Sequence, residues 1–415
     1  MTSLQTIIAS IILCISTITL GQDHCHDLNS AVCVPSIEED QRLQEEIKRL
    51  SKVIQLKAES NASEKIRKLK LKGPFKHLRR YFKTQVILNT EIIRAAHEEI
   101  EHFEEDLVGP ELIIKVKQLL KEEVAKTTFP KKIKLDMISK ISSVRVFTFL
   151  DYMNHVGISE RYLPSLFRAH CGMDGMSVNA FATTIEDLPM VLICPGFLIN
   201  VNLMKNFSEF ISRTTMVLSH EISHHIDSSD YPGAYKKYHS CFSKNYGKVL
   251  NIKPGQKCFE TSTPCEEPYQ EKYDSVVNKC AERRKNCKAL FCKSSERGCR
   301  YFGLYFPKKR LKKCLETKVG TPCYSRVAKN HLGEIVADAY SAKVLSSLYK
   351  EFNYSEGEIL NSLSHNVKPL CGIIVDEGIH PTTEFRLNEL FGKNENLREL
   401  LSCNQQESIG PSCSF

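Results

Sequence analysis

The first part of the chain has the apolar spacing of amphipathic helices. Ser36 and Glu39 form a capping box, and apolar residues then recur every three or four positions over residues 43–54. Because residues at this spacing share one face of a helix, we expect a helix that begins near residue 36. The same spacing predicts further helices over residues 92–104, 111–126 and 132–154.

From residue 171 the pattern changes. Short apolar runs over residues 177–183 and 189–199 predict strands, and helical spacing returns over residues 205–226 and 331–349. Between these two helices, residues 241–323 hold nine cysteines and have weak hydrophobic periodicity, which predicts a disulfide-rich insertion. The expected fold class is therefore mainly α (α+β).

Composition and cysteine usage limit the class of protein. With 415 residues, 42% of them hydrophobic, the chain can bury a core, which excludes a disordered protein. Its 17 cysteines indicate an oxidising compartment or a metal-rich protein. If Cys14 is removed with a signal peptide, 16 cysteines remain and can pair as eight disulfides. Since the insertion holds an odd number, at least one of its cysteines must then pair outside it.

Residues 1–21 are expected to form a secretory signal peptide. Residues 7–20 are uncharged and mostly apolar, and Gly21 precedes the polar stretch that begins at Gln22. An uncleaved anchor is the alternative, but 14 residues fall short of the roughly 20 that a spanning helix needs. No later segment is long and apolar enough for an integral membrane span. We therefore expect a secreted protein, extracellular or periplasmic, and a glycoprotein if its sequons at Asn61, Asn206 and Asn353 are used.

A basic run follows the first predicted helix. Nine of the nineteen residues from Lys65 to Lys83 are Lys or Arg, and the whole chain has a formal net charge of +8. This run could contact an anionic polysaccharide or a lipid surface, and a solvated helix face is the alternative. Nucleic acid is not an expected partner of an exported chain.

The candidate chemistry begins with an H-E-x-x-H motif over residues 220–224. On a helix, His220 and His224 share a face and can bind one zinc ion, and Glu221 can take a proton from water beside that ion. Catalytic zinc usually has three protein ligands, so a third is needed. Glu334 can supply it, and Asp338, one turn later, can accept a hydrogen bond from a ligand histidine and fix its tautomer.

Together these blocks resemble the neprilysin-type zinc metallopeptidases, which have thermolysin-like catalytic domains. The matching blocks are Val178–Phe181, Pro189–Leu198, His220–Asp227, Leu332–Asp338 and His380–Asn388, followed by Cys403 and Cys413. The resemblance covers residues 175–415 apart from the insertion, and residues 90–170 faintly. It implies a catalytic domain over residues 171–415, with a small mixed sheet and active-site helices, after an N-terminal helical region over residues 22–170.

The resemblance also implies roles for single residues. His220, His224 and Glu334 would bind one Zn²⁺, and Glu221 would act as general base. His380 would stabilise the oxyanion, and Arg386 would hold a substrate carbonyl. Asp338 would assist catalysis as described above. On the substrate side, Asn179 and Ala180 would bind the peptide main chain as an added strand, and Met216 and Val217 would line an apolar specificity pocket. Asp227 would support the zinc histidines.

Several departures from the family pattern change what is expected. His225 stands where the family has a small residue, and we expect it on the surface or behind the ligands. Ala339-Tyr340-Ser341 replaces an Asn-Gly-Gly, and Pro381 follows His380 directly. The N-terminal region is much shorter than the one that forms a lid in those enzymes, which puts their limit to small peptides in doubt.

The function expected from the sequence is a secreted zinc endopeptidase acting on peptides or proteins. Cleavage on the amino side of hydrophobic residues is the preference that the resemblance implies. The Asn179–Thr183 and His380–Glu384 segments are also similar to membrane-embedded, HtpX-like zinc peptidases, which need transmembrane helices that this chain lacks. The alternative of a different class is a catalytically inactive binding module that uses the basic and cysteine-rich regions.

Overall fold

The computed structural model describes the helices, the sheet and the first residues of the predicted insertion. The described residues are 24–33, 37–70, 76–101, 109–155, 167, 169–172, 177–204, 206–246, 331–367, 371, 380–403 and 413–415. The predicted signal peptide and residues 247–323 of the predicted insertion lie outside them, as does Ser36 of the capping box.

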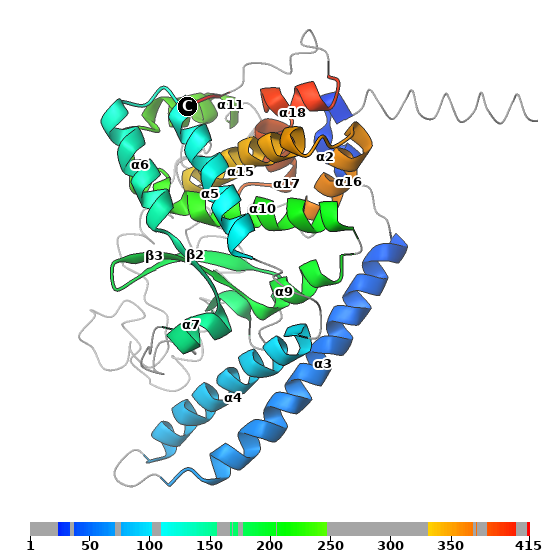
Figure 1. Cartoon of the computed structure of the whole chain (residues 1–415), viewed down its shortest axis with the longest axis vertical. Helices are drawn as coiled ribbons and strands as arrows, with labels where there is room; N and C mark the ends of the chain where they lie inside the picture. Colours follow the sequence, from blue (N-terminus) through cyan, green and yellow to red (C-terminus); the bar gives the residue numbers. More distant parts are fainter. Residues whose placement is uncertain are drawn as a thin grey trace, which may run out of the picture.

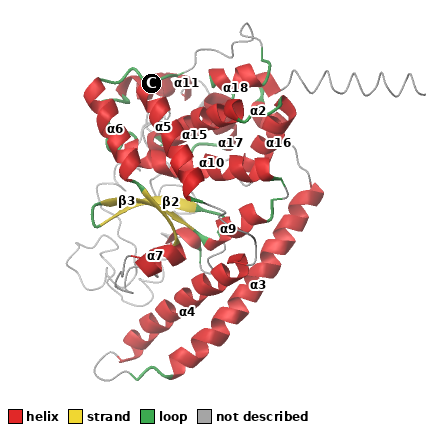
Figure 2. Cartoon of the chain, viewed as in Figure 1, coloured by secondary structure: helices red, strands yellow, loops and turns green. Residues whose placement is uncertain are grey.

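The described chain is mainly helical and contains a three-stranded mixed sheet (Figures 1 and 2). The helices are α2 (Leu28–Val32), α3 (Ile37–Arg67), α4 (Lys76–Glu101), α5 (Pro110–Lys126), α6 (Lys131–Ser143), α7 (Phe149–His155), α9 (Pro195–Asn202), α10 (Phe207–Ser223), α11 (Lys236–Tyr246), α15 (Leu332–Glu351), α16 (Glu356–Val367), α17 (Thr383–Phe385) and α18 (Glu395–Leu400). A 3₁₀ turn, η1 (His224–Ile226), continues α10, and a π-helical turn, η3 (Arg386–Phe391), continues α17. The mainly α prediction is therefore confirmed.

The sheet has the strand order β1–β3–β2, with β1 (Arg145–Thr148), β2 (Ala180–Ile185) and β3 (Leu188–Ile193). β1 pairs with β3 in parallel and β2 pairs with β3 antiparallel, so β2 is an edge strand. Figure 1 shows α5, α6, α10 and α15 on one side of this sheet and α7, α9 and the α3–α4 hairpin on the other. Since β1 precedes residue 170, the sheet includes strands from both sides of the predicted domain boundary.

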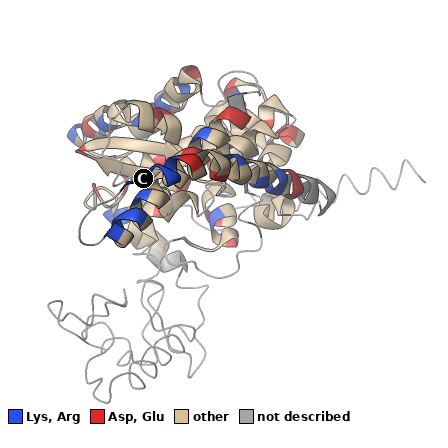
Figure 3. Cartoon of the chain, turned by 90° about the horizontal axis from the view of Figure 1, so that it is seen from below, with Lys and Arg blue, Asp and Glu red and all other residues tan. Residues whose placement is uncertain are grey.

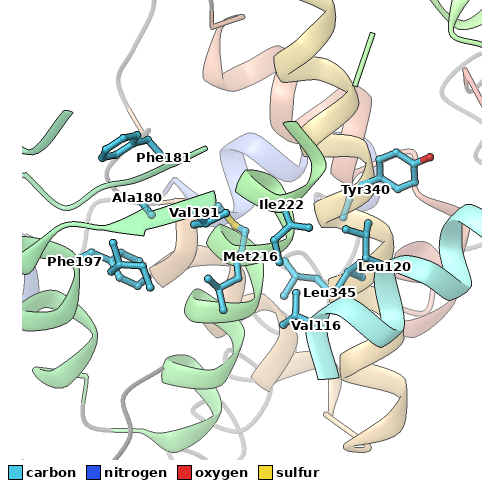
Figure 4. Packing of buried hydrophobic residues seen from close by; sticks show 14 of the residues in the cluster. Val116, Leu120, Ala180, Phe181, Val191, Phe197, Met216, Ile222, Tyr340 and Leu345 are labelled. Carbon is cyan, nitrogen blue, oxygen red and sulfur yellow. The ribbon is translucent and has the colours of Figure 1, made fainter. Parts of the chain in front are cut away.

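One apolar core connects the sheet to the helices above it. Figure 4 shows side chains from β2, β3, α5, α9, α10 and α15 meeting there. Its labelled members are Val116, Leu120, Ala180, Phe181, Val191, Phe197, Met216, Ile222, Tyr340 and Leu345, each less than 9% exposed. This packing fixes α10 against both the sheet and α15, and α10 with the turn that continues it, together with α15, carries the three candidate metal ligands.

Two predictions of secondary structure were wrong in part. The helix predicted over residues 132–154 is broken, because residues 145–148 (Arg-Val-Phe-Thr), rich in β-branched and aromatic side chains, form β1 and pair with β3. The strand predicted over residues 189–199 ends at Ile193, because Pro195 occupies the first position of α9 and starts a helix.

Eight described cysteines form four disulfides. Cys25–Cys403 and Cys33–Cys371 tie the segment around α2 to the last third of the chain, and Cys171–Cys194 joins the segment before β2 to the end of β3. Cys241, the first cysteine of the predicted insertion, pairs with Cys413. The prediction that an insertion cysteine pairs outside the insertion is therefore confirmed. None of the described helices combines the length and the apolar character needed to cross a bilayer.

Candidate metal centre

Helix α10 brings the two histidines of the motif to one point. The helix begins after Asn206, whose side chain accepts a hydrogen bond from the Ser208 backbone N–H, and it ends at Ser223. His220 and His224 are one turn apart, so their rings lie on the same face, with their Nε2 atoms 3.2 Å apart.

Glu334 reaches the same point from the first turn of α15. Its Oε2 lies 3.2 Å from His220 Nε2, and its Oε1 lies 3.6 Å from His224 Nε2. Ligand atoms held about 2.0–2.1 Å from a tetrahedral ion are about 3.3–3.4 Å apart, so these separations fit one ion of that size. Glu334 Oε2 is buried and lies within ion-pair distance of both His220 Nε2 and His380 Nδ1. These three residues therefore form a group that could hold a metal ion.

Each histidine has a carboxylate behind it. His220 Nδ1 donates to Asp338 Oδ1 at 2.9 Å, and His224 Nδ1 donates to Asp227 Oδ2 at 3.2 Å. With both Nδ1 atoms occupied as donors, both Nε2 lone pairs face the metal position in the neutral rings. Asp338 and Asp227 thus lie on the Nδ1 sides of His220 and His224.

Arg386 holds Asp338 with a two-point contact. Its Nε and Nη2 donate to Asp338 Oδ2 and Oδ1 at 2.6 and 2.8 Å, and both side chains are buried. Burial raises the pKa of Asp338, but the charge of Arg386 and the bond from His220 outweigh it and lower the pKa to about 2. Asp338 is therefore ionised at neutral pH. The predicted contact of Arg386 with a substrate carbonyl would have to use Nη1 or the second N–H of Nη2, since Nε and one N–H of Nη2 are engaged.

The charges of the site also act on its ligands. Burial lowers the pKa of His220, but the hydrogen bonds to Asp338 and Glu334 reverse this and raise it to about 10. Burial raises the pKa of Glu334, but hydrogen bonds to His220 and His380 and the charges of the ligand histidines bring it well below its ordinary value. The ligand histidines and Glu334 are thus strongly coupled through their opposite charges.

Glu221, the predicted general base, lies between the metal position and the sheet. Its Oε2 accepts a hydrogen bond from the Ala182 backbone N–H of β2 at 2.8 Å. Burial raises the pKa of the carboxyl, the direction that suits a residue that must accept and then return a proton near neutral pH.

The free edge of β2 faces this carboxylate. The Asn179 carbonyl accepts from Cys194 N–H on the β3 side, so alternation turns the main-chain groups of Ala180 and Ala182 toward the open edge. The bond from Ala182 to Glu221 agrees with this. Asn179 is exposed, and its side-chain amide donates to the His170 carbonyl at 3.1 Å.

Of the remaining predicted residues, His380 lies beside Glu334, and Met216 and Val217 belong to or pack against the core. His380 is 43% exposed, and its Nδ1 lies 3.1 Å from Glu334 Oε2. Met216 is 7% exposed and packs in the core beside Val191 (Figure 4), and Val217 is half-buried against that core.

His225 is not on the surface. It is 5% exposed, and its Nε2 donates to the Met190 carbonyl at 3.0 Å, which joins the end of α10 to β3. Burial lowers the pKa of its ring, so it is neutral at pH 7. The surface location considered from the sequence is therefore wrong.

The sequence reasoning missed the part played by Gly333. A Cβ at this position would lie 2.9 Å from Asp227 Oδ2, so the glycine makes room for the carboxylate that supports His224. The signal in the sequence was a glycine in the first turn of a helix, where it costs stability relative to alanine unless space is needed.

A second group of potential ligands, His24, Cys25 and Cys403, is not a metal site. Its two cysteines form a disulfide with each other and so offer no thiolate.

No model of a known protein family matches the chain. A comparison with curated proteins likewise finds no match.

Proposed function

We propose that the protein is a secreted Zn²⁺-dependent endopeptidase. The observation that carries the proposal is that His220, His224 and Glu334 converge at zinc-ligand separations while Glu221 lies beside them. Two histidines and one glutamate are a ligand set of catalytic Zn²⁺ in metallopeptidases. The disulfides formed by the described cysteines are compatible with secretion.

Zn²⁺ bound by these residues would polarise the scissile carbonyl and lower the pKa of water. Glu221 would take the proton of the attacking water and pass it to the leaving amine. His380, half-exposed at the rim, would donate a hydrogen bond to the oxygen that becomes negative during attack. Asp338 and Asp227 would keep both ligand imidazoles in the tautomer that binds metal.

The open edge of β2 would bind the substrate. A peptide lying antiparallel to it would pair with the main chain of Ala180, and Asn179 would contact the next residue. The preference for a hydrophobic residue after the cleaved bond rests on the resemblance at Met216 and Val217.

Purified protein should contain one zinc per chain and should hydrolyse a quenched peptide, with a chelator abolishing the activity. A Glu221→Gln variant should keep its zinc and lose hydrolysis by at least about 10³-fold, because the proton acceptor is removed. Zinc-loaded wild type that cleaves neither peptides nor folded proteins would refute the proposal and favour the inactive binding module. Cleavage sites mapped by mass spectrometry would test both the hydrophobic preference and the limit on substrate size.

A further inference from the structure

The α3–α4 hairpin ends in an exposed basic tip that the proposed peptidase chemistry does not use. We define the hairpin tip as residues 65–70 and 76–83, the end of α3 with the residues after it and the first two turns of α4. Every residue of α4 from 76 to 83 whose exposure is described is exposed, and burial on this helix begins only near Asn89. The tip therefore projects into solvent.

The charge of the hairpin tip is strongly positive. It carries eight Lys or Arg residues and no Asp or Glu. Lys65 pairs with Glu91, and Lys68 pairs with Glu64. Within the described part of the chain the other six make no ion pair: Arg67, Lys70, Lys76, Arg79, Arg80 and Lys83. Figure 3, which views the molecule from below, shows Lys and Arg at the start of α4 and at the end of α3.

Two aromatic residues lie next to these cations in the sequence. Tyr81 and Phe82 are 55% and 59% exposed, and their rings meet edge to face at a centroid separation of 5.8 Å. Lys76, Arg79, Arg80 and Lys83 form one stripe of α4, and the two rings lie on the other side of the helix, the amphipathic arrangement of a helix at a membrane surface. An exposed aromatic pair opposite a basic stripe has no partner in the described fold.

We propose that the hairpin tip docks on an anionic phospholipid surface. Lys and Arg side chains are attracted to acidic headgroups, and aromatic rings favour the boundary between headgroups and acyl chains. The aromatic pair favours lipid over an anionic polysaccharide, because a polysaccharide can neutralise the cations but offers no apolar layer for two exposed rings. The tip lies on the opposite side of the sheet from α15, which carries Glu334 (Figure 1), so docking leaves the metal centre free.

The chain contains no tryptophan, which gives the test a clean probe. In a Phe82→Trp variant, the emission of the sole tryptophan should shift to shorter wavelength when vesicles of 70% phosphatidylcholine and 30% phosphatidylserine are added. It should not shift with pure phosphatidylcholine. A Phe352→Trp variant is the matched control, since Phe352 is 53% exposed on another part of the molecule, and its emission should not change.

Sedimentation with the same vesicles measures the contributions of charge and apolar contact. Arg79→Gln with Arg80→Gln should weaken binding about 25-fold, or about five-fold for each charge. Lys131→Gln with Lys132→Gln on α6 changes the net charge equally at an exposed site elsewhere and should leave binding unchanged. Tyr81→Ser with Phe82→Ser should weaken binding at least about ten-fold.

Equal binding of the two tip variants and the α6 control would overturn the proposal. The proposal would also be overturned if the protein bound immobilised heparin but not vesicles, and if heparin binding were lost in the arginine variant and kept in the Tyr81→Ser with Phe82→Ser variant. That result would assign the tip to a polysaccharide. Glu221→Gln should bind vesicles like the wild type, so a failure of vesicle binding is distinguishable from a failure of the peptidase proposal. Zinc content, equal in all the tip variants, checks that they are folded.

Discussion

Replacing Gly333 by alanine tests whether the carboxylates behind the histidines set the affinity for metal. The new Cβ would lie 2.9 Å from Asp227 Oδ2, about 0.5 Å closer than an ordinary contact of about 3.4 Å. Asp227 must therefore move away from α15. Its other oxygen accepts from the Ser229 backbone N–H at 2.7 Å, which limits how it can turn.

This displacement has a calculable consequence at the metal position. The bond from His224 Nδ1 to Asp227 Oδ2 is already 3.2 Å long, and a shift of about 0.5 Å would take it beyond hydrogen-bond length. Loss of such an outer partner typically costs 10–100-fold in metal affinity, or about 1.4–2.7 kcal/mol. We therefore expect Gly333→Ala to bind Zn²⁺ about 10–100-fold more weakly than the wild type.

Competition with a chromophoric chelator measures this affinity directly. Gly357→Ala is the matched control, because Gly357 also lies in the first turn of a helix, α16, and a Cβ there meets no atom within 4 Å. That substitution should leave zinc affinity unchanged and should stabilise the fold slightly. Equal zinc affinity in the two variants would refute the reasoning, since it would show that the Asp227 contact does not govern His224.

Three further predictions concern the charges and cross-links around the site. Asp338→Asn should lower the free energy of unfolding by about 3–5 kcal/mol, because it leaves Arg386 buried without a counter-charge. An unchanged midpoint of thermal unfolding would contradict this prediction. Zinc binding at pH 7 should release at least one proton, because the pKa of His220 is about 10 without metal. The affinity for zinc should therefore rise about tenfold per pH unit as the pH approaches that value. Calorimetry in buffers of different ionisation enthalpy measures the number of protons released, and a value of zero would contradict the prediction. Cys241→Ser with Cys413→Ser should lower the free energy of unfolding by about 2–5 kcal/mol, because the disulfide no longer constrains the unfolded chain. Denaturant titration measures this free energy, and an unchanged value would show that the disulfide does not constrain the unfolded chain.

The sequence predicts best where the contacts are local. Helical spacing correctly predicted α10 and α15, and four-residue spacing predicted which side chains would share a face, as for His220 and His224. It failed at residues 145–148, because their place in the sheet depends on pairing with β3, more than forty positions later. Periodicity within one segment contains no information about such a partner.

The outer contacts of the site show the same limit. Asp338 could be predicted, since it lies one turn from Glu334 on the same helix. The bond from His225 to the Met190 carbonyl could not, because it joins residues 35 positions apart and its acceptor is a main-chain group. The fit of Gly333 to Asp227 likewise depends on where η1 meets α15, which is a matter of tertiary packing.

Packing between α10 and α15 sets the relative positions of the helices that carry the candidate ligands. Ser341 Oγ donates to the Met216 carbonyl at 2.9 Å and lies 3.2 Å from Ser219 Oγ, both in the buried contact between the two helices. Ser341 belongs to the Ala-Tyr-Ser segment that departs from the family pattern, and here it joins the helices directly. Because these contacts involve none of the three candidate ligands, substitutions around the ligands leave the contact between the two helices in place. A change such as Gly333→Ala should therefore appear as weaker zinc binding by a folded protein, and not as loss of the fold.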